Sequence, residues 1–127
     1  MKQGYIYIGD NIFDSLLAIS SEEQSQGLMF KDPPVPVMSF IYPNPRINKF
    51  WMKDTPAELD IIFCCDNKIS QICKGIPFST QIIGDDKNSD LVIELPFGTI
   101  KSLGVKINTN VGLLKSTAAE LKKLFKY

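Results

Sequence analysis

The stretch from Phe50 to Phe63, FWMKDTPAELDIIF, constrains the fold most strongly, because it joins two apolar runs through a polar turn. The second run continues to Cys65 and ends at the Asp-Asn dipeptide of residues 66–67, which suits a two-residue hairpin turn. Residues 68–74 then alternate in polarity, as a returning strand does. The sequence therefore predicts an antiparallel hairpin in mid-chain, and it predicts that residues 50–63 form two core strands with the turn between them.

Short strands separated by turn residues account for most of the remaining chain. The expected strands cover residues 4–9, 12–19, 37–42, 48–53, 59–65, 68–74, 90–95, 105–107 and 111–114. Helices are expected after a capping box at Ser20 and Glu23, after a cap at Thr99, and from residue 116 onward. This pattern is typical of an all-β fold with minor α content. We expect a compact β-barrel-like domain over residues 1–115, with residues 116–127 as a C-terminal helical extension of the same domain.

Charge and hydropathy exclude several classes of protein. The chain has 127 residues, which fits one domain, and its 14 basic and 14 acidic residues give a net charge of zero. Zero net charge argues against a nucleic-acid binder, because phosphate neutralisation dominates the affinity of such proteins. No apolar run approaches the roughly 20 residues of a membrane span. No signal peptide is visible before the first strand, so we expect a soluble protein that is cytoplasmic at synthesis.

The residue inventory also limits the chemistry. Histidine is absent, which removes the commonest general base and the commonest metal ligand. Cys64, Cys65 and Cys73 lack the spacing of a zinc site and are expected to be reduced thiols. Because adjacent residues of a strand point to opposite faces, Cys64 and Cys65 are expected to divide between the core and the exterior. We expect no metal and no cofactor.

Three motifs resemble those of a known family. Residues 27–31, GLMFK, resemble its GLM(F/Y)R segment, residues 50–63 resemble FWMKNT…LDIxF, and residues 91–106 resemble YVLELPAGT…LGIK. Together they are similar to domain-of-unknown-function family 192, over residues 12–114. The resemblance implies a compact, β-rich, barrel-like domain and no established activity.

The chain departs from the family pattern within the second motif. Asp54 stands where the family has asparagine, Pro56 stands at a position that is usually apolar, and Glu58 stands where the family has proline. The strand at residues 37–42 also lacks the family's glycine.

Two carboxylates interrupt apolar strands: Asp60 in LDIIF and Glu94 in LVIELP. A carboxylate in such a place usually has a partner. One interpretation joins Asp60 and Glu94 with Lys53 as an acid/base cluster, with Trp51 lining a pocket. The other has each carboxylate accept backbone N–H bonds at a barrel rim or lie on the outward face, with Trp51 as a core or rim aromatic residue.

These observations favour a non-catalytic interaction or structural module with protein partners or self-association. The reasons are the missing histidine, the missing metal spacing and the lack of a phosphate-binding glycine loop. Such a module suits a subunit of a larger assembly. A phage virion component is one instance, because Arg46 is the single arginine among many lysines and indicates AT-rich coding. The alternative is a small-molecule-binding domain, or a small enzyme that uses the carboxylates near Trp51.

Overall fold

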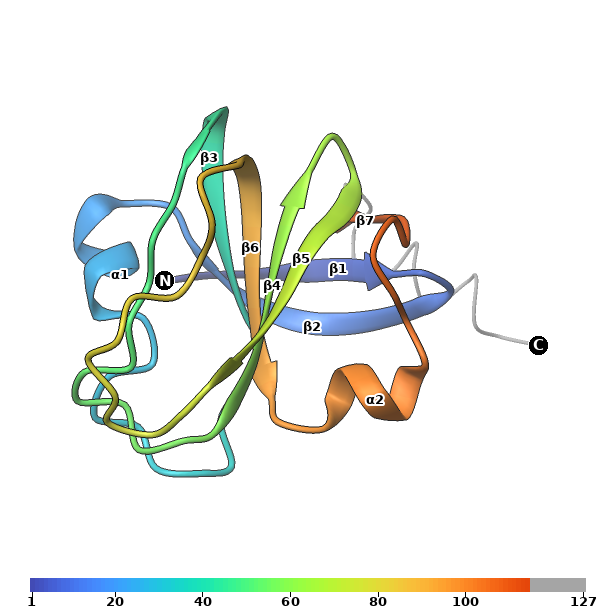
Figure 1. Cartoon of the computed structure of the whole chain (residues 1–127). Helices are drawn as coiled ribbons and strands as arrows, with labels where there is room; N and C mark the ends of the chain where they lie inside the picture. Colours follow the sequence, from blue (N-terminus) through green and yellow to red (C-terminus); the bar gives the residue numbers. More distant parts are fainter. Residues whose placement is uncertain (115–127) are drawn as a thin grey trace.

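One seven-stranded sheet organises the part of the chain that the computed structural model describes, residues 1–114 (Figure 1). The elements in chain order are β1 (Lys2–Ile8), β2 (Asn11–Ala18), α1 (Ser21–Gln26), β3 (Met38–Ile47), β4 (Leu59–Cys65), β5 (Lys68–Gly75), β6 (Asn88–Pro96), α2 (Thr99–Leu103) and β7 (Val111–Leu114). The expected mostly-β fold with short helices is confirmed. The predicted helix from residue 116 lies outside the described residues.

The sheet is curled, with the strand order β5-β4-β6-β3-β2-β1-β7. All neighbouring pairs are antiparallel except β2 and β3, which are parallel. The two edge strands approach each other, because Lys68 at the start of β5 forms a bridge with Asn110 just before β7. The sheet thus forms a half-barrel that carries buried side chains on both faces.

Two hydrophobic clusters lie on the two faces of the sheet. The first cluster consists of Ala18, Leu28, Val35, Met38, Phe40, Met52, Ala57, Leu59, Ile61, Phe63 and Val92. The second cluster consists of Ile6, Ile8, Ile62, Cys64, Ile69, Leu91, Ile93, Leu95, Ile100 and Val111. Strand β4 contributes to both clusters, which explains why its sequence is almost continuously apolar. Cys64 is buried and Cys65 is half-exposed, so the predicted division of these two thiols is confirmed.

The first helix begins and ends where the sequence predicts. The Ser20 side chain accepts a hydrogen bond from the Glu23 N–H, and the Glu23 carboxylate accepts one from the Ser20 N–H, which completes the capping box. Gly27 ends the helix with φ 49°. The chain then inserts Leu28 into the first cluster, and the Gln24 amide holds α1 against the carbonyl groups of Ala18 and Ile41. Neither helix within residues 1–114 has the length and apolar character of a membrane span.

Several predicted boundaries were wrong. The prolines of residues 43–46 do not form a turn, because β3 continues through them to Ile47 with an irregular register against β6. Residues 48–53 are not a strand and contribute only an isolated bridge between Phe50 and Ile83. Residues 105–107 are also not a strand, because β7 pairs with β1 instead. The stretch from residue 50 to residue 63 is therefore one loop followed by one core strand.

The loop at residues 53–55 is held by two neighbouring loops. The Phe30 N–H donates to the Asp54 carbonyl oxygen at 2.7 Å, and the Phe78 N–H donates to the Thr55 carbonyl oxygen at 3.1 Å. Phe30, Asp54 and Phe78 all have left-handed backbones, with φ of 64°, 55° and 63°. Left-handed φ is unusual for residues as bulky as phenylalanine, so these loops are held in shape by the contacts around them.

Candidate functional site

A pocket of about 340 Å³ opens between α1, β3 and the loop at residues 48–55. Its lining includes Gly27, Phe40, Tyr42, Phe50, Trp51 and Glu94. The volume lies at the lower end of the roughly 300–1,000 Å³ range of small-molecule sites. The elements that form it are the end of a helix, a central strand and a well-anchored loop.

Glu94 lies on the pocket-facing side of β6, in register with Met38 of β3 and Ile61 of β4. Its relative exposure is 5%, and no residue in the described range donates a hydrogen bond to its carboxyl group. Burial raises the pKa of Glu94 from its ordinary value of 4.5 to about 8. The site therefore holds a neutral carboxylic acid at pH 7, with one O–H donor and one carbonyl acceptor.

The Glu94 carboxyl group is open to the pocket. Among residues 1–114, no side-chain oxygen or nitrogen is both fully buried and without a hydrogen-bond partner. Because Glu94 has no such partner, its carboxyl oxygens must reach the space that the pocket provides. A carboxyl group in this position is available to water or to a ligand in the pocket.

Gly27 leaves room above this carboxyl group. A Cβ atom at residue 27 would lie 3.3 Å from the Phe40 ring and 3.7 Å from Glu94 Oε1. The φ of 49° also favours glycine. The first motif, GLMFK, therefore both ends α1 and opens the pocket.

Aromatic rings form one wall of the pocket. Phe50 packs edge-to-face against Phe40, with ring centroids 4.9 Å apart, and against Phe63 at 5.7 Å. Trp51 stands at the rim with 43% exposure, and the Lys53 ammonium lies 5.3 Å from its ring centroid. Trp51 thus lines the pocket as one interpretation expected, whereas Lys53 contacts Trp51 without lining the pocket itself.

Tyr42 and Arg46 also line the pocket. The Arg46 guanidinium carbon lies 5.4 Å from the Tyr42 ring centroid, as in a cation–π contact. Burial raises the pKa of Tyr42 to about 12, while Arg46 opposes this shift. The phenol therefore keeps its proton across the physiological range, and the pocket lining carries a positive charge from Arg46.

Asp60 belongs to a different place. It pairs with Leu95 on β6, whose side chain lies in the second cluster, so Asp60 and Glu94 occupy opposite faces of the sheet. Asp60 Oδ2 accepts backbone N–H bonds from Gly98 at 3.1 Å and Ile100 at 3.0 Å. The structure does not bring the two carboxylates together, which removes the expected acid/base cluster.

These bonds also correct the predicted start of α2. The N-cap is Gly98 and makes no side-chain cap bond, while the Thr99 hydroxyl donates to the Pro96 carbonyl oxygen. Asp60 supplies the missing cap from the neighbouring strand. The carboxylate also favours the helix N-terminus electrostatically.

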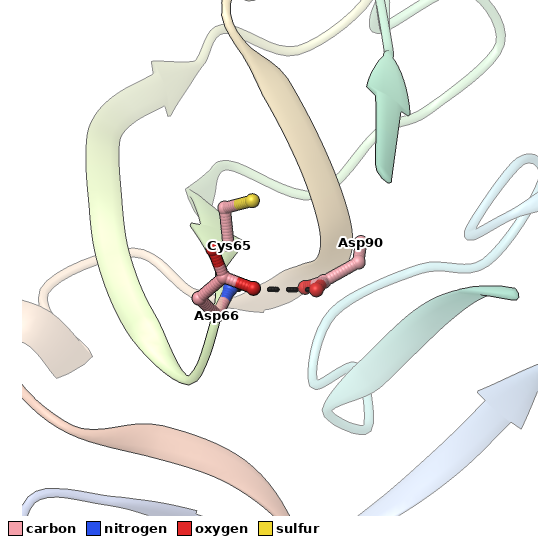
Figure 2. Close-up of side chains that lie close together, drawn as sticks. All are labelled: Cys65, Asp66 and Asp90. Carbon is pink, nitrogen blue, oxygen red and sulfur yellow. Dashed lines mark hydrogen bonds between the residues drawn. The ribbon is translucent and has the colours of Figure 1, made fainter. Parts of the chain in front are cut away.

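A second group of ionisable side chains lies at the β4–β5 turn. Figure 2 shows Cys65, Asp66 and Asp90, whose ligand atoms all lie within 4.8 Å of one another. The Asp90 carboxylate accepts the Asp66 backbone N–H at 3.3 Å, so it already supports the turn. Burial, with the charges of Asp90 and Asp66, raises the pKa of the Cys65 thiol and disfavours the thiolate that would bind a metal. The closeness of these three side chains is therefore explained by the β4–β5 turn and does not indicate a metal site.

Sequence reasoning identified Trp51 and Glu94 but missed other parts of the pocket. Gly27 was predicted only as a helix end, and the roles of Tyr42 and Asn48 were not foreseen. A glycine followed by an apolar run carries some signal, because it marks a close approach of the backbone. Asn48 carries no such signal in the sequence, because its position in the pocket depends on the tertiary fold.

The fold and sequence match known proteins. The model of the DUF192 family, described as an uncharacterized ACR, matches residues 6–113. A crystal structure of a protein of unknown function from Novosphingobium aromaticivorans DSM 12444 is similar, with 28% identity, a TM-score of 0.81, and coverage of 87% of this chain and 84% of that chain.

A second crystal structure, from Sinorhizobium meliloti 1021, is provisionally described as a transcription regulator. It has 27% identity and a TM-score of 0.83, and the match covers 88% of this chain and 94% of that chain. None of the curated proteins matches the chain. The family match extends over nearly all of the described strands, and the chain belongs to the DUF192 family.

Proposed function

We propose that this protein is a small-molecule-binding domain whose ligand occupies the pocket above Glu94. The observation that carries the proposal is the Glu94 carboxyl group, which lies at the pocket surface and has no hydrogen-bond partner among residues 1–114. A ligand that hydrogen-bonds to this group would satisfy both its donor and its acceptor. Trp51 and Phe50 provide apolar and aromatic contact area for the ligand.

The geometry favours binding over acid/base catalysis. Glu94 is the only carboxylate that lines the pocket within residues 1–114, because Asp60 lies on the other face. A single neutral acid can donate a hydrogen bond, but no second carboxylate stands opposite it to complete the pair that many hydrolases use. The pocket therefore holds a ligand more readily than it transforms one.

A fragment screen by NMR tests this proposal. Trp51 is the single tryptophan, so its indole N–H gives an unambiguous signal at the pocket rim. We expect fragments that shift this signal in the wild-type protein to lose binding in Glu94→Met, which keeps the length of the side chain and removes its hydrogen bonds. Asp60→Asn is the matched control, because it alters the buried carboxylate on the other face. Fragment binding that survives Glu94→Met unchanged would contradict the proposal.

Our second proposal is that this protein is an interaction module that associates with itself. The observation that favours it is the exposure of Phe30 at 75% and Phe78 at 64%, on two loops that meet the same turn. Aromatic side chains are enriched in protein interfaces. Light scattering of the wild type and of a Phe30→Ser/Phe78→Ser variant tests this proposal. Self-association that the substitutions abolish is the expected result, and a wild-type monomer at high concentration would rule it out.

A further inference from the structure

Two side-chain amides that line the pocket, those of Gln24 and Asn48, have oxygens that accept no hydrogen bond within residues 1–114. The Gln24 amide nitrogen donates to the carbonyl oxygens of Ala18 and Ile41, at 3.1 and 2.9 Å. These two carbonyl partners fix the orientation of the amide, because only its nitrogen can donate to them. Its own oxygen accepts no hydrogen bond from any residue in the described part of the chain.

Asn48 repeats this arrangement. Its amide nitrogen donates to the carbonyl oxygens of Arg46 and Ser89, at 3.2 and 3.0 Å, and also contacts the Ser89 hydroxyl. Gln24 and Asn48 both line the pocket, and no fully buried side-chain oxygen in residues 1–114 lacks a partner. Their free carbonyl oxygens are therefore accessible, and they can accept hydrogen bonds from a donor-rich ligand in the pocket.

The charge of the lining selects against an amine as that donor. The charged residues that line the pocket besides Glu94 are Arg46 and Lys49. Lys49 is paired with Asp86 at 3.0 Å, whereas Arg46 has no ion pair among the described residues. Arg46 is therefore the lining residue whose positive charge is not paired within residues 1–114. That charge repels ammonium groups and attracts anions.

A donor-rich ligand that is also anionic must carry hydroxyl groups and an acid group. We infer that the pocket binds an acidic sugar, a small polyhydroxylated ring bearing one carboxylate or phosphate. In this arrangement the hydroxyl groups donate to the oxygens of Gln24 and Asn48, the Glu94 carboxyl group exchanges hydrogen bonds with the ring, and the acid group lies toward Arg46. The exposed face of Trp51 offers the apolar surface that sugar rings pack against. This inference rests on the proposed function and names its ligand class.

Matched probes separate the three features of this ligand. The Trp51 indole N–H of the full chain is titrated with glucuronate, glucose 6-phosphate, glucose, glucosamine and cyclohexanecarboxylate. Glucose lacks the acid group, glucosamine reverses the charge, and cyclohexanecarboxylate keeps the ring and the carboxylate but lacks the hydroxyl groups. We expect at least one acidic sugar to bind about fivefold or more tightly than glucose and glucosamine. We expect it to exceed cyclohexanecarboxylate by a similar factor, about fivefold. The two acidic sugars together tell whether the acid group is a carboxylate or a phosphate.

Two substitutions complete the test. Arg46→Gln is expected to remove the preference for acidic sugars over glucose, whereas Lys101→Gln, which makes the same charge change on α2, is expected to leave it intact. Equal binding of cyclohexanecarboxylate, stronger binding of glucosamine, or no saturable shift with either acidic sugar at millimolar concentration would overturn the inference. The proposed function would survive such a result if fragments still shift Trp51 in the wild type and not in Glu94→Met. The proposed function would fail if no fragment shifts the Trp51 signal in the wild type, or if fragments shift it equally in Glu94→Met.

Discussion

Asp60 and Glu94 lie on neighbouring strands, one residue out of register, and their side chains point to opposite faces of the sheet. Asp60 accepts two backbone N–H bonds and caps α2, while Glu94 accepts none from residues 1–114 and faces the pocket. The two carboxylates interrupt similar apolar strands, but they are expected to have opposite effects on the stability of the fold. Asp60 stabilises the fold, whereas the binding role that we propose for Glu94 carries a cost in stability.

Replacing Glu94 by an apolar residue should stabilise the protein. Glu94→Met removes a buried polar group that has no partner in the described part of the chain, so the free energy of unfolding should rise by about 1–3 kcal/mol. Urea denaturation of both proteins measures this difference. A loss of stability in the variant would show that Glu94 has a stabilising partner, contrary to the structure.

The raised pKa of Glu94 makes stability depend on pH. In the folded chain the Glu94 pKa is about 8, and its ordinary value is 4.5, so between these values the folded state holds a proton that the unfolded state has lost. The contribution of this group to the free energy of unfolding therefore falls as pH rises through this window, by about 1.4 kcal/mol per pH unit. It is constant below the lower value and above the upper one.

The stability difference between the wild type and Glu94→Gln isolates this effect, because the amide does not titrate. The variant should gain stability relative to the wild type as pH rises from 5 to 8. A difference that does not change with pH would mean that Glu94 is ionised in the folded protein at neutral pH.

Asp60 should show the opposite behaviour to Glu94 in stability experiments. Asp60→Ala leaves the N–H groups of Gly98 and Ile100 without their acceptor, at a cost of about 2–4 kcal/mol. Asp60→Asn keeps one acceptor oxygen and should cost less. Thermal and urea denaturation of the two variants check this order, and equal stability of Asp60→Ala and the wild type would refute the capping role.

Because the backbone of Phe30 is left-handed, the substitution Phe30→Gly should stabilise the protein. A non-glycine residue in this region costs about 1–2 kcal/mol, and Phe30 is 75% exposed, so little packing is lost when its ring is removed. After the entropy cost of glycine, Phe30→Gly should gain about 0.5–1 kcal/mol. Ile107→Gly is the control, because Ile107 is exposed at 48% without a left-handed φ, and it should lose stability. Equal effects at both positions would argue against the strain.

The sequence was most informative where local chemistry decides the structure. The capping box at Ser20 and Glu23 and the hairpin at residues 66–67 both formed as predicted, because each depends on a few neighbouring residues. The turn residues Asp66 and Asn67 have φ of 51° and 63°, as such a tight hairpin requires. The strand at residues 59–65 was equally clear, because both of its faces are buried.

The errors occurred where distant segments compete for the same strand. The prolines of residues 43–46 predict a turn, but pairing of β3 with the far end of β6 keeps the chain extended. Residues 111–114 pair with β1 and not with residues 105–107, which no local signal reveals. The opposite orientations of Asp60 and Glu94 depend on the β4–β6 register, so the sequence could identify both carboxylates but could not decide whether they meet.

The titration of the Glu94 carboxyl carbon, followed by NMR and assigned by its absence in Glu94→Gln, tests the central claim most directly. A buried, unpartnered acid at the pocket surface should titrate near pH 8, well above the ordinary value of 4.5, and its midpoint should move when a ligand occupies the pocket. A midpoint near 4.5 that no pocket ligand changes would show that Glu94 is an ordinary solvated carboxylate, and it would contradict the account of this site.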